Sequence, residues 1–586
     1  MRVSYTWLRE LVEIPYTAKE LGEVLTQQGM AVDALEHWGR PYEGIVVGVI
    51  KGVAKHPSAD NLSICQVDVG REVLQVVCGA PNVGVGQHVA VAQVGARIGD
   101  RMIERTKVRG VESEGMCCAA DELGISGDHS GLLILDASFG AGTPLERVVS
   151  GEDYIFELDI ANNRPDLLCH IGIAREIWAH LRRRDGKGGE YQPPRFELEE
   201  RGGAVGDAVR VEVEDMALCP RYTARVVEEV RIGPSPVWMQ ARLYRLGMRP
   251  INNVVDITNY VMLEYGHPLH AFDGEQLEGR RIVVRRARRG ERLVTLDGVE
   301  RELDEGMIVI ADEARGVAIA GVMGGENTEV RATTRQIVLE SAYFEPGTIR
   351  RAAKLLGLHS ESSRRFERGV RGAAVEASAR AAQLMSLYAG GVVRRGMLDV
   401  GGGEKKRRVR VRLERCEGLL GMKLAGEAVE KTLRTLGFGC EDVGGSLVVS
   451  VPEHRVDVVE EADIAEEIAR VWGYQGVPID AGTPFRSNVP VGRVYACRAI
   501  LRELLAAEGL YEAYNPSLVS EELLSRAGVR VGDHEQGLVA LANATTQEQS
   551  VLRTAVYPGL LRNVQHNIAR GAKSVRLFEL GRVYRR

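Results

Sequence analysis

The sequence has little that would place it in a membrane, secreted or zinc-binding class. No apolar run approaches the roughly 18 residues needed to span a bilayer, and the N-terminus lacks the apolar core of a signal peptide. The nine cysteines include no C-x-x-C pair, which argues against a disulfide framework and against a zinc finger. We therefore expect a soluble, cytoplasmic protein whose cysteines are reduced and buried.

An excess of one charge is also absent. The net charge is −6 and the pI is near 6.2, so contacts with nucleic acid would have to come from local basic patches. Hydrophobic residues make up 45% of the chain and charged residues 27%, which are globular values. Because 586 residues exceed what one hydrophobic core normally supports, we expect a multidomain α+β chain with about four domains.

In the middle of the chain, polar residues stand beside apolar segments that are punctuated by turns. Gly266-His-Pro-Leu-His270 predicts a turn that carries His270 on a loop. Further on, Ile319-Ala-Gly-Val-Met-Gly-Gly325 is dense in glycine, which lets a backbone approach a ligand closely. Both segments are therefore candidates for the wall of a pocket.

A carboxylate and several hydroxyls follow this glycine-rich turn. Glu340 lies in an apolar, strand-like run, and hydroxyls with three arginines follow from Ser360 to Gly369. A histidine, a carboxylate, hydroxyls, a glycine turn and arginines could together form a hydrolytic pocket for a phosphate-bearing substrate. The alternative is structural, with a histidine beside a turn and a glutamate at the edge of a sheet. The residue pattern alone leaves both open.

The first 150 residues change from a helical to a β pattern. Thr17-Ala-Lys-Glu20 is a capping box that predicts the start of a helix, which Gly29 can end. Short β-rich runs follow at residues 45–50, 74–77 and 88–92, separated by turns. Strands of this length and spacing predict a small barrel.

Three motifs in this region resemble the tRNA-binding oligonucleotide-binding (OB) fold: His56-Pro-Ser-Ala-Asp-Asn-Leu62, Val77-Cys-Gly-Ala-Pro-Asn82 and Arg109-Gly-Val-Glu-Ser-Glu-Gly-Met116. The resemblance implies a basic groove for nucleic acid. The candidate basic residues are Arg97, Arg101, Arg105, Lys107 and Arg109. Because acidic residues are interleaved, a solvated charged surface is the alternative for each of them.

A second cluster of charge lies near residue 465. On a helix, Asp463, Glu466 and Glu467 occupy positions i, i+3 and i+4, which would put three carboxylates on one face. Like charges this close repel one another, so we expect a cation to offset them, either Mg²⁺ or the basic residues of a partner. The alternative is a solvated acidic helix.

In their order along the chain, these motifs resemble the β subunits of bacterial phenylalanine–tRNA ligase. The resemblance implies a tRNA-binding OB-fold barrel, a central α/β editing domain, a small winged-helix-like domain with the acidic helix, and a partial class II synthetase-like module. The expected divisions are 1–38 (helical segment), 39–150 (barrel), 151–200 (helical segment and a linker at Asp185 to Gly189), 207–392 (editing), 403–480 (acidic helix) and 490–586 (class II-like module).

The resemblance also implies roles for particular residues. An editing pocket that hydrolyses mischarged Tyr-tRNA(Phe) would comprise Arg249, His270, Gly324, Glu340, Ser360 and Ser362, where relatives often have Thr and Ala at the last segment. The family's Mg²⁺ carboxylates, shared with an α subunit, match Asp457, Asp463, Glu466 and Glu467.

The remaining implications concern the partners. Members of the family pair with an α chain as an α2β2 tetramer, in which α binds ATP and phenylalanine and β holds tRNA(Phe). The class II-like module is expected to lack an ATP site, and the sequence contains no Walker-type phosphate loop. Relatives carry more sequence at the C-terminus, so the chain looks truncated. The competing hypothesis is a noncatalytic tRNA-binding scaffold with a vestigial pocket.

Overall fold

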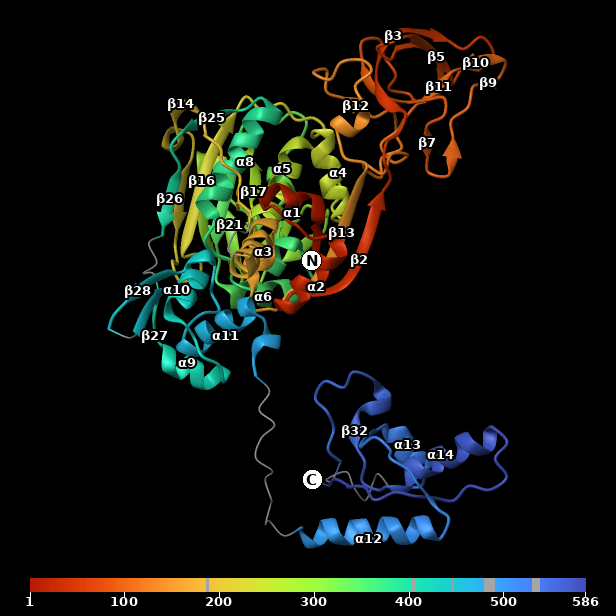
Figure 1. Ribbon diagram of the computed structural model, residues 1–586, viewed down its shortest axis with the longest axis vertical. Helices are drawn as coiled ribbons and strands as arrows, with labels where there is room; N and C mark the ends of the chain where they lie inside the picture. The colour runs from red at the N-terminus through yellow and green to blue at the C-terminus, as the bar shows by residue number, and fades with distance from the viewer. Residues whose placement is uncertain (186–188, 403–406, 445, 479–490, 530–537, 586) are drawn as a thin grey trace. The chain divides into compact units, whose positions relative to one another are not determined.

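A computed structural model divides the chain into two compact units, Met1–Ile479 and Asp480–Arg586 (Figure 1). The structure describes residues 1–185, 189–402, 407–444, 446–478, 491–529 and 538–585. Part of the linker expected at Asp185 to Gly189 lies outside these ranges. No helix within them is long and apolar enough to cross a membrane.

The N-terminal segment contains strands as well as helices. Helix α1 spans Tyr5–Leu11 and α2 spans Ala18–Gln27. The side chains of Thr17 and Glu20 form the predicted capping box at the start of α2. The neighbouring strands form a three-stranded antiparallel sheet in the order β1-β13-β2: β1 (Arg2–Ser4), β2 (Ala31–Gly39) and β13 (Glu152–Asp159). The chain therefore enters the barrel domain along β2 and returns along β13 (Figure 1).

The barrel domain is built on a six-stranded antiparallel sheet in the order β11-β6-β3-β4-β5, with β12 paired to β6. Its strands are β3 (Ile45–Lys55), β4 (Ser63–Asp68), β5 (Val73–Cys78), β6 (His88–Gln93), β11 (Gly115–Cys117) and β12 (Ile134–Leu135). The three predicted β runs thus all become strands. Two small hairpins project from this sheet: β7 (Arg97–Ile98) with β8 (Arg101–Met102), and β9 (Thr106–Val108) with β10 (Val111–Ser113).

The central domain contains two sheets that share one hydrophobic core. The first has the order β14-β25-β16-β24-β17, with β26 paired to β16, and the second has the order β15-β18-β21-β22-β23. The first comprises β14 (Glu200–Ala204), β16 (Arg221–Glu228), β17 (His270–Asp273), β24 (Ile337–Tyr343), β25 (Val392–Arg395) and β26 (Leu398–Gly401). The second comprises β15 (Arg210–Val213), β18 (Arg281–Arg286), β21 (Ile308–Ala311), β22 (Gly316–Ile319) and β23 (Met323–Gly324), beside the hairpin of β19 (Arg292–Val294) and β20 (Glu300–Glu302).

Helices cover the other face of the first sheet. Helix α5 (Asn253–Tyr265) begins at Asn252, whose side chain accepts two backbone N–H bonds, and ends at the left-handed Gly266. It packs against α8 (Ala374–Ala389), which contacts β16 and β24. The remaining helices of this region are α3 (His170–Asp185), α4 (Val237–Arg245), α6 (Pro346–Leu356) and α7 (Glu361–Phe366).

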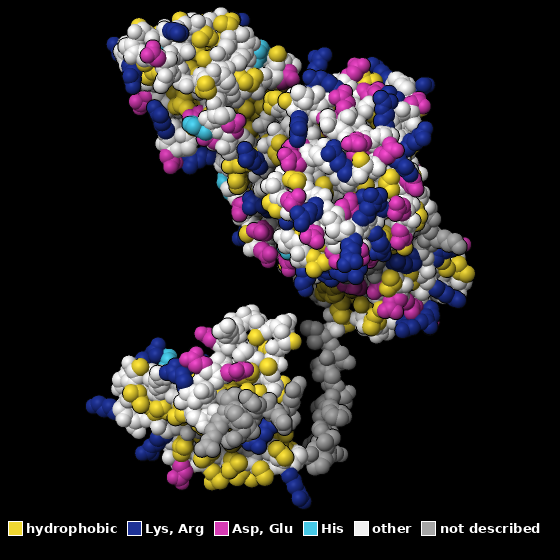
Figure 2. All heavy atoms as spheres, turned by 180° about the vertical axis from the view of Figure 1, so that it is seen from behind, with side chains coloured by type: hydrophobic (Ala, Val, Ile, Leu, Met, Phe, Trp, Pro, Cys, Tyr) yellow, Lys and Arg dark blue, Asp and Glu magenta, His cyan; other side chains and the backbone are white. Residues whose placement is uncertain are grey.

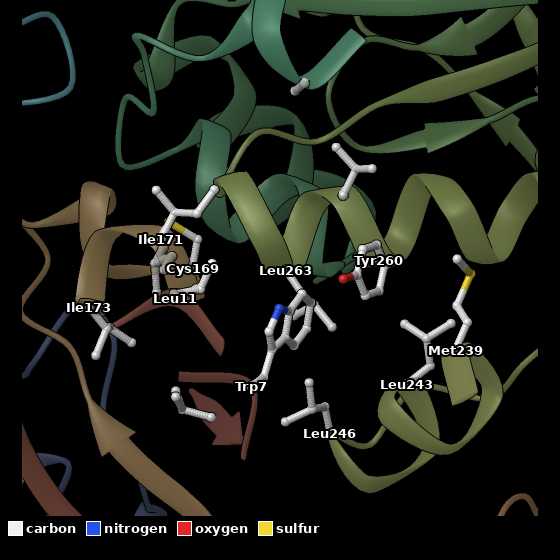
Figure 3. Close-up of a cluster of buried hydrophobic side chains, with 14 of the residues drawn as sticks. Trp7, Leu11, Cys169, Ile171, Ile173, Met239, Leu243, Leu246, Tyr260 and Leu263 are labelled. Carbon is white, nitrogen blue, oxygen red and sulfur yellow. The ribbon is translucent and has the colours of Figure 1, made fainter. Parts of the chain in front are cut away.

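One hydrophobic core joins the N-terminal segment to these helices (Figure 3). The indole of Trp7 stacks on the ring of His170 at 3.9 Å and on that of Tyr260 at 4.6 Å between centroids. Leu243 and Leu263 are buried in the same core, on α4 and α5. The first residues of the chain therefore pack against the helices of the central domain.

A small α+β domain follows, in which a three-stranded sheet in the order β27-β29-β28 packs on three helices. Its elements are β27 (Arg408–Arg412), α9 (Leu413–Leu420), α10 (Gly426–Thr435), β28 (Gly439–Asp442), β29 (Ser446–Ser450) and α11 (Glu461–Trp472). Both α10 and α11 contact α3.

The second unit has little core of its own. Its two described sheets have two strands each, β30 with β33 and β31 with β32. Its elements are α12 (Arg493–Ala507), β30 (Tyr511–Glu512), β31 (Leu518–Val519), α13 (Glu521–Arg526), β32 (Val551–Leu552), α14 (Tyr557–Ala569) and β33 (Leu577–Phe578). No residue of α12 is buried, although Val494 and Tyr495 are large apolar side chains.

Candidate functional site

A cavity of about 240 Å³ opens at the margin of the two central sheets. This is below the roughly 300–1,000 Å³ of drug-sized pockets, so the volume suits a single amino-acid side chain. Five of the six expected pocket residues line it: His270, Gly324, Glu340, Ser360 and Ser362. Residues that the sequence reasoning did not single out complete the wall, including Thr258 and Asn259 of α5.

His270 and Glu340 face each other across two neighbouring strands. They are direct antiparallel partners of β17 and β24, and side chains in such positions lie on the same face of a sheet. The expectation of a loop at His270 is wrong, because α5 ends at Gly266 and three residues suffice for the turn before β17 begins. Glu340 lies on β24, between β16 and β17, and not at the edge of the sheet.

The carboxyl group of Glu340 is buried and has one hydrogen-bond partner among the described residues. The Tyr222 hydroxyl donates to Oε2 of Glu340 at 2.8 Å. Burial raises the pKa of Glu340 to about 8, although the hydrogen bond from Tyr222 acts in the opposite direction. Glu340 is therefore mostly uncharged at neutral pH, and a neutral carboxylic acid can both donate and accept a hydrogen bond.

The imidazole of His270 is also uncharged. Burial lowers its pKa to about 4, because desolvation disfavours the cation. The edge of its ring meets Phe272, with 4.5 Å between the ring centroids. A neutral imidazole has one nitrogen that donates and one that accepts. The cavity therefore presents two neutral polar groups that are suited to an uncharged hydroxyl.

Gly324 allows the two sheets to approach each other at this point. A Cβ atom on this residue would lie 2.7 Å from Nε2 of His270 and closer still to Cε1. Any larger residue would therefore displace the imidazole. The carbonyl of Gly324 accepts a hydrogen bond from the Leu296 N–H at 3.0 Å, which holds the turn in place.

The two serines differ in their surroundings. Ser360 caps α7, since its hydroxyl accepts from the Ser363 N–H at 3.0 Å and donates to the Val322 carbonyl at 2.9 Å. Ser362 lines the cavity, and its hydroxyl has no hydrogen-bond partner in the part of the chain that the structure describes. Ser360 is thus a structural residue that positions Ser362 at the wall.

Arg249 does not join this group. It is exposed on the segment between α4 and α5, whereas the cavity contacts Thr258, Asn259 and Met262 of α5. Hydrogen bonds from Ser130 lower the pKa of Asp128, and the charge of Arg249 adds to this effect, so its guanidinium lies near the barrel domain. Helix α5, with 13 residues at 1.5 Å each, spans about 20 Å between the segment that carries Arg249 and the turn before His270.

The acidic helix differs from its prediction. Glu467 is buried and accepts hydrogen bonds from Arg455 and Arg470. Asp457 pairs with Arg455 at 2.8 Å. Two of the four carboxylates expected to hold Mg²⁺ are therefore already paired with arginines of this chain.

The other two carboxylates of this set also have separate surroundings. Asp463 accepts the N–H groups of Val459 and Glu460, each at 2.8 Å, and so caps α11. Glu466 is exposed. Within the described residues, no group of three or more His, Cys, Asp or Glu side chains is arranged to hold a metal ion. The four carboxylates do not converge.

Arg470, the single arginine of α11, belongs to a buried ion-pair network that reaches α3. Arg470 contacts Glu176 at 2.5 Å, and Arg164 contacts the same carboxylate at 2.6 Å. Burial would raise the pKa of Glu467, but the guanidinium groups of Arg470 and Arg455 more than offset this and hold it well below its usual range. Arg470 stands three residues after Glu467, so the sequence could have predicted their ion pair. The ion pair of Arg470 with Glu176 on α3 could not be predicted, because it depends on the tertiary fold.

The five basic residues expected to bind tRNA are all exposed, on or beside the two hairpins of the barrel domain. Arg105 is partly neutralised by Glu114 at 2.7 Å and Glu112 at 3.7 Å. The other four, Arg97, Arg101, Lys107 and Arg109, form no ion pair with a described residue. On the face shown in Figure 2, basic and acidic side chains are interspersed over the larger unit.

Comparison with known proteins places these regions in one family. Residues 45–144 match a putative tRNA-binding domain, 218–390 a B3/4 domain, 409–474 a tRNA synthetase B5 domain and 487–586 the phenylalanyl-tRNA synthetase β-chain CLM domain. The phenylalanine–tRNA ligase β subunit of Geobacter sulfurreducens is 44% identical over all of this chain and 73% of its own length. The corresponding subunits of Anaeromyxobacter dehalogenans and Geobacillus kaustophilus are 44% and 42% identical, over 72% and 73% of their lengths.

The chain belongs to the phenylalanine–tRNA ligase β-subunit family. The B3/4 match contains the cavity, and the match to the tRNA-binding domain contains both basic hairpins. The B5 match contains α11 with Arg455 and Arg470, whereas Arg164 and Glu176 of the ion-pair network lie outside it.

Proposed function

We propose that the central domain hydrolyses mischarged Tyr-tRNA(Phe), while the chain supports the attachment of phenylalanine to tRNA(Phe) as the β subunit of an α2β2 ligase. The observation that carries the hydrolytic role is the pairing of His270 with Glu340 in a cavity of single-side-chain size. Both groups are uncharged near neutral pH, because burial lowers the pKa of His270 to about 4 and raises that of Glu340 to about 8.

Selection would rest on one phenolic hydroxyl. A site built to hydrogen-bond a hydroxyl rejects the analogue without it by about 10⁴ to 10⁵, because buried polar groups are then left unpaired. A phenylalanyl side chain would leave the cavity-facing oxygen of Glu340 without a partner, whereas a tyrosyl side chain would satisfy it.

The hydrolytic step would use water and not a covalent intermediate on serine. The Ser360 hydroxyl is committed to the cap of α7, and no described hydrogen bond joins either serine to His270. In this proposal the pocket binds the tyrosyl side chain, and the 3′ end of the tRNA lies at its mouth beside Ser362. Because Arg249 is exposed and outside the cavity, its proposed role is to contact the tRNA on its way to the pocket.

The partners follow from the family. The exposed basic residues of the barrel hairpins are the proposed tRNA contacts, with Arg97, Arg101, Lys107 and Arg109 free of ion pairs to described residues and Arg105 in competition with Glu114. ATP would be bound by the α subunit. The four acidic residues proposed for Mg²⁺ do not fit one site in this chain, since Asp457 and Glu467 are already paired with arginines.

The test is deacylation of Tyr-tRNA(Phe) by the full chain assembled with its α subunit. We expect His270→Ala and Glu340→Ala each to abolish most of the activity and to leave tRNA binding unchanged. Retained hydrolysis in both variants would refute the assignment. Absence of hydrolysis in the wild-type protein, with tRNA still bound, would favour the alternative of a noncatalytic scaffold.

A further inference from the structure

A buried tyrosine lies behind the cavity and does not line it. Tyr222 of β16 has no exposed surface. It is the direct cross-strand partner of Ala342, while Ala224 is the partner of Glu340. Tyr222 and Glu340 are therefore diagonal neighbours on one face of the sheet, within reach of an aromatic side chain. Their contact is the 2.8 Å hydrogen bond from the Tyr222 hydroxyl to Oε2.

This bond divides the two oxygens of the carboxyl group between two partners. Oε2 is held from behind by Tyr222, so Oε1 is left for a ligand in the cavity. Because a hydroxyl that donates to Oε2 places the acid proton on Oε1, the group facing the cavity is a donor when Glu340 is neutral and an acceptor when it is ionised.

The other titratable groups around this carboxyl do not compete with Tyr222. His270 faces it from β17, and its neutral imidazole has no described hydrogen bond to Glu340. Cys219, just before β16, donates its thiol to the Arg221 carbonyl at 3.5 Å. Tyr222 is thus the one described side chain that fixes the orientation of Glu340.

We propose that Tyr222 is a positioning residue that sets the preference of the cavity for a phenolic over a phenyl side chain, through its hold on Oε2 of Glu340. The proposal rests on the proposed function of the cavity and extends it to a residue that contacts Glu340 and does not line the cavity itself. Without the Tyr222 hydroxyl, the carboxyl group is free to rotate, and both oxygens compete for the same ligand.

The expected effect of Tyr222→Phe has two parts. Loss of a partner for a buried acceptor should lower kcat/KM for Tyr-tRNA(Phe) by about 10-fold or more. The pH inflection of the reaction should also move upward, because the hydrogen bond from Tyr222 favours the ionised carboxylate and its removal raises the pKa of Glu340. A purely structural role for Tyr222 would not move this inflection.

The experiment compares wild type, Tyr222→Phe and Tyr343→Phe in the assembled enzyme between pH 6.5 and 9. Tyr343 is a matched control, since it lies on β24 and its hydroxyl accepts from the Gly372 N–H at 2.8 Å, away from Glu340. We expect the shift only in Tyr222→Phe. An unchanged inflection and an unchanged Tyr-to-Phe ratio of deacylation in that variant would overturn the proposal.

A binding measurement separates this inference from the hydrolytic role. Calorimetry with non-hydrolysable 3′-amide analogues of tyrosyl- and phenylalanyl-adenosine gives the preference of the cavity without turnover. If the wild type prefers the tyrosyl analogue and Tyr222→Phe loses that preference, the inference stands even where hydrolysis is absent. If both proteins show the same ratio, the inference fails although hydrolysis is retained.

Discussion

Removal of Arg470 should detach the acidic helix α11 from α3. The guanidinium of Arg470 is 5% exposed and contacts Glu176 of α3 at 2.5 Å and Glu467 at 2.6 Å. The network around it has the cations Arg164, Arg455 and Arg470 and the anions Asp166, Glu176, Asp457 and Glu467. Arg470→Met keeps a long apolar stem but leaves two cations facing four carboxylates.

The size of the effect follows from the burial of these groups. Breaking a buried ion pair by removing one partner costs about 3–5 kcal/mol, because the remaining charge is left without compensation. Since about 1.4 kcal/mol corresponds to a factor of ten, we expect the equilibrium constant for local opening of α11 away from α3 to rise by at least about 100-fold. An ion pair of the same domain with an exposed arginine gives the contrast: Arg415 is 69% exposed and contacts Glu461, which is 13% exposed, at 3.3 Å. Arg415→Met should change opening by no more than about 5-fold.

Backbone amide exchange of Glu461–Trp472 in the full chain measures this opening directly. Exchange of β16 and β24 serves as an internal reference, because the central sheets have their own core. Protection of α11 in Arg470→Met within threefold of the wild type, at unchanged protection of the reference strands, would refute the view that this network holds the two elements together.

Three further outcomes are expected. Gly324→Ala should reduce Tyr-tRNA(Phe) hydrolysis by at least about 10-fold with the fold intact, because a Cβ there would displace His270; circular dichroism and deacylation check both parts, and full activity would contradict the packing argument. Acid should release α11 from α3, because the fold depresses the pKa values of Glu467 and Asp166. The stabilisation from these two carboxylates is present above their unfolded pKa values of about 4 and is lost as the pH falls from there toward the depressed folded values. Amide exchange of α11 measured from pH 6 to 3 would detect this loss. Finally, the purified chain should show no ATP–pyrophosphate exchange with phenylalanine until the α subunit is added, and appreciable exchange without it would contradict the division of labour.

Local patterns predicted local structure well. The capping box at Thr17 and Glu20 needs only residues three positions apart, and it formed as expected. The β runs of the barrel follow from side-chain preference over five or six residues, and they became β3, β5 and β6. The family resemblance, which depends on the order of motifs along the chain, was confirmed by relatives that are 42–44% identical.

Motifs and spacing along the chain indicated which residues could matter, whereas the three-dimensional fold set their partners and their charge. Spacing put Asp463, Glu466 and Glu467 within one helical turn, but which of them is buried depends on the face that α11 turns toward α3. Likewise, the family resemblance implied one pocket for Arg249 and His270, but the fold leaves Arg249 exposed and outside the cavity. No sequence pattern indicates Tyr222, because its hydrogen bond to Glu340 arises from the pairing of strands that are 118 residues apart in the chain. The neutral state of Glu340 arises only from burial between two sheets, since desolvation is a property of the fold and not of the residue.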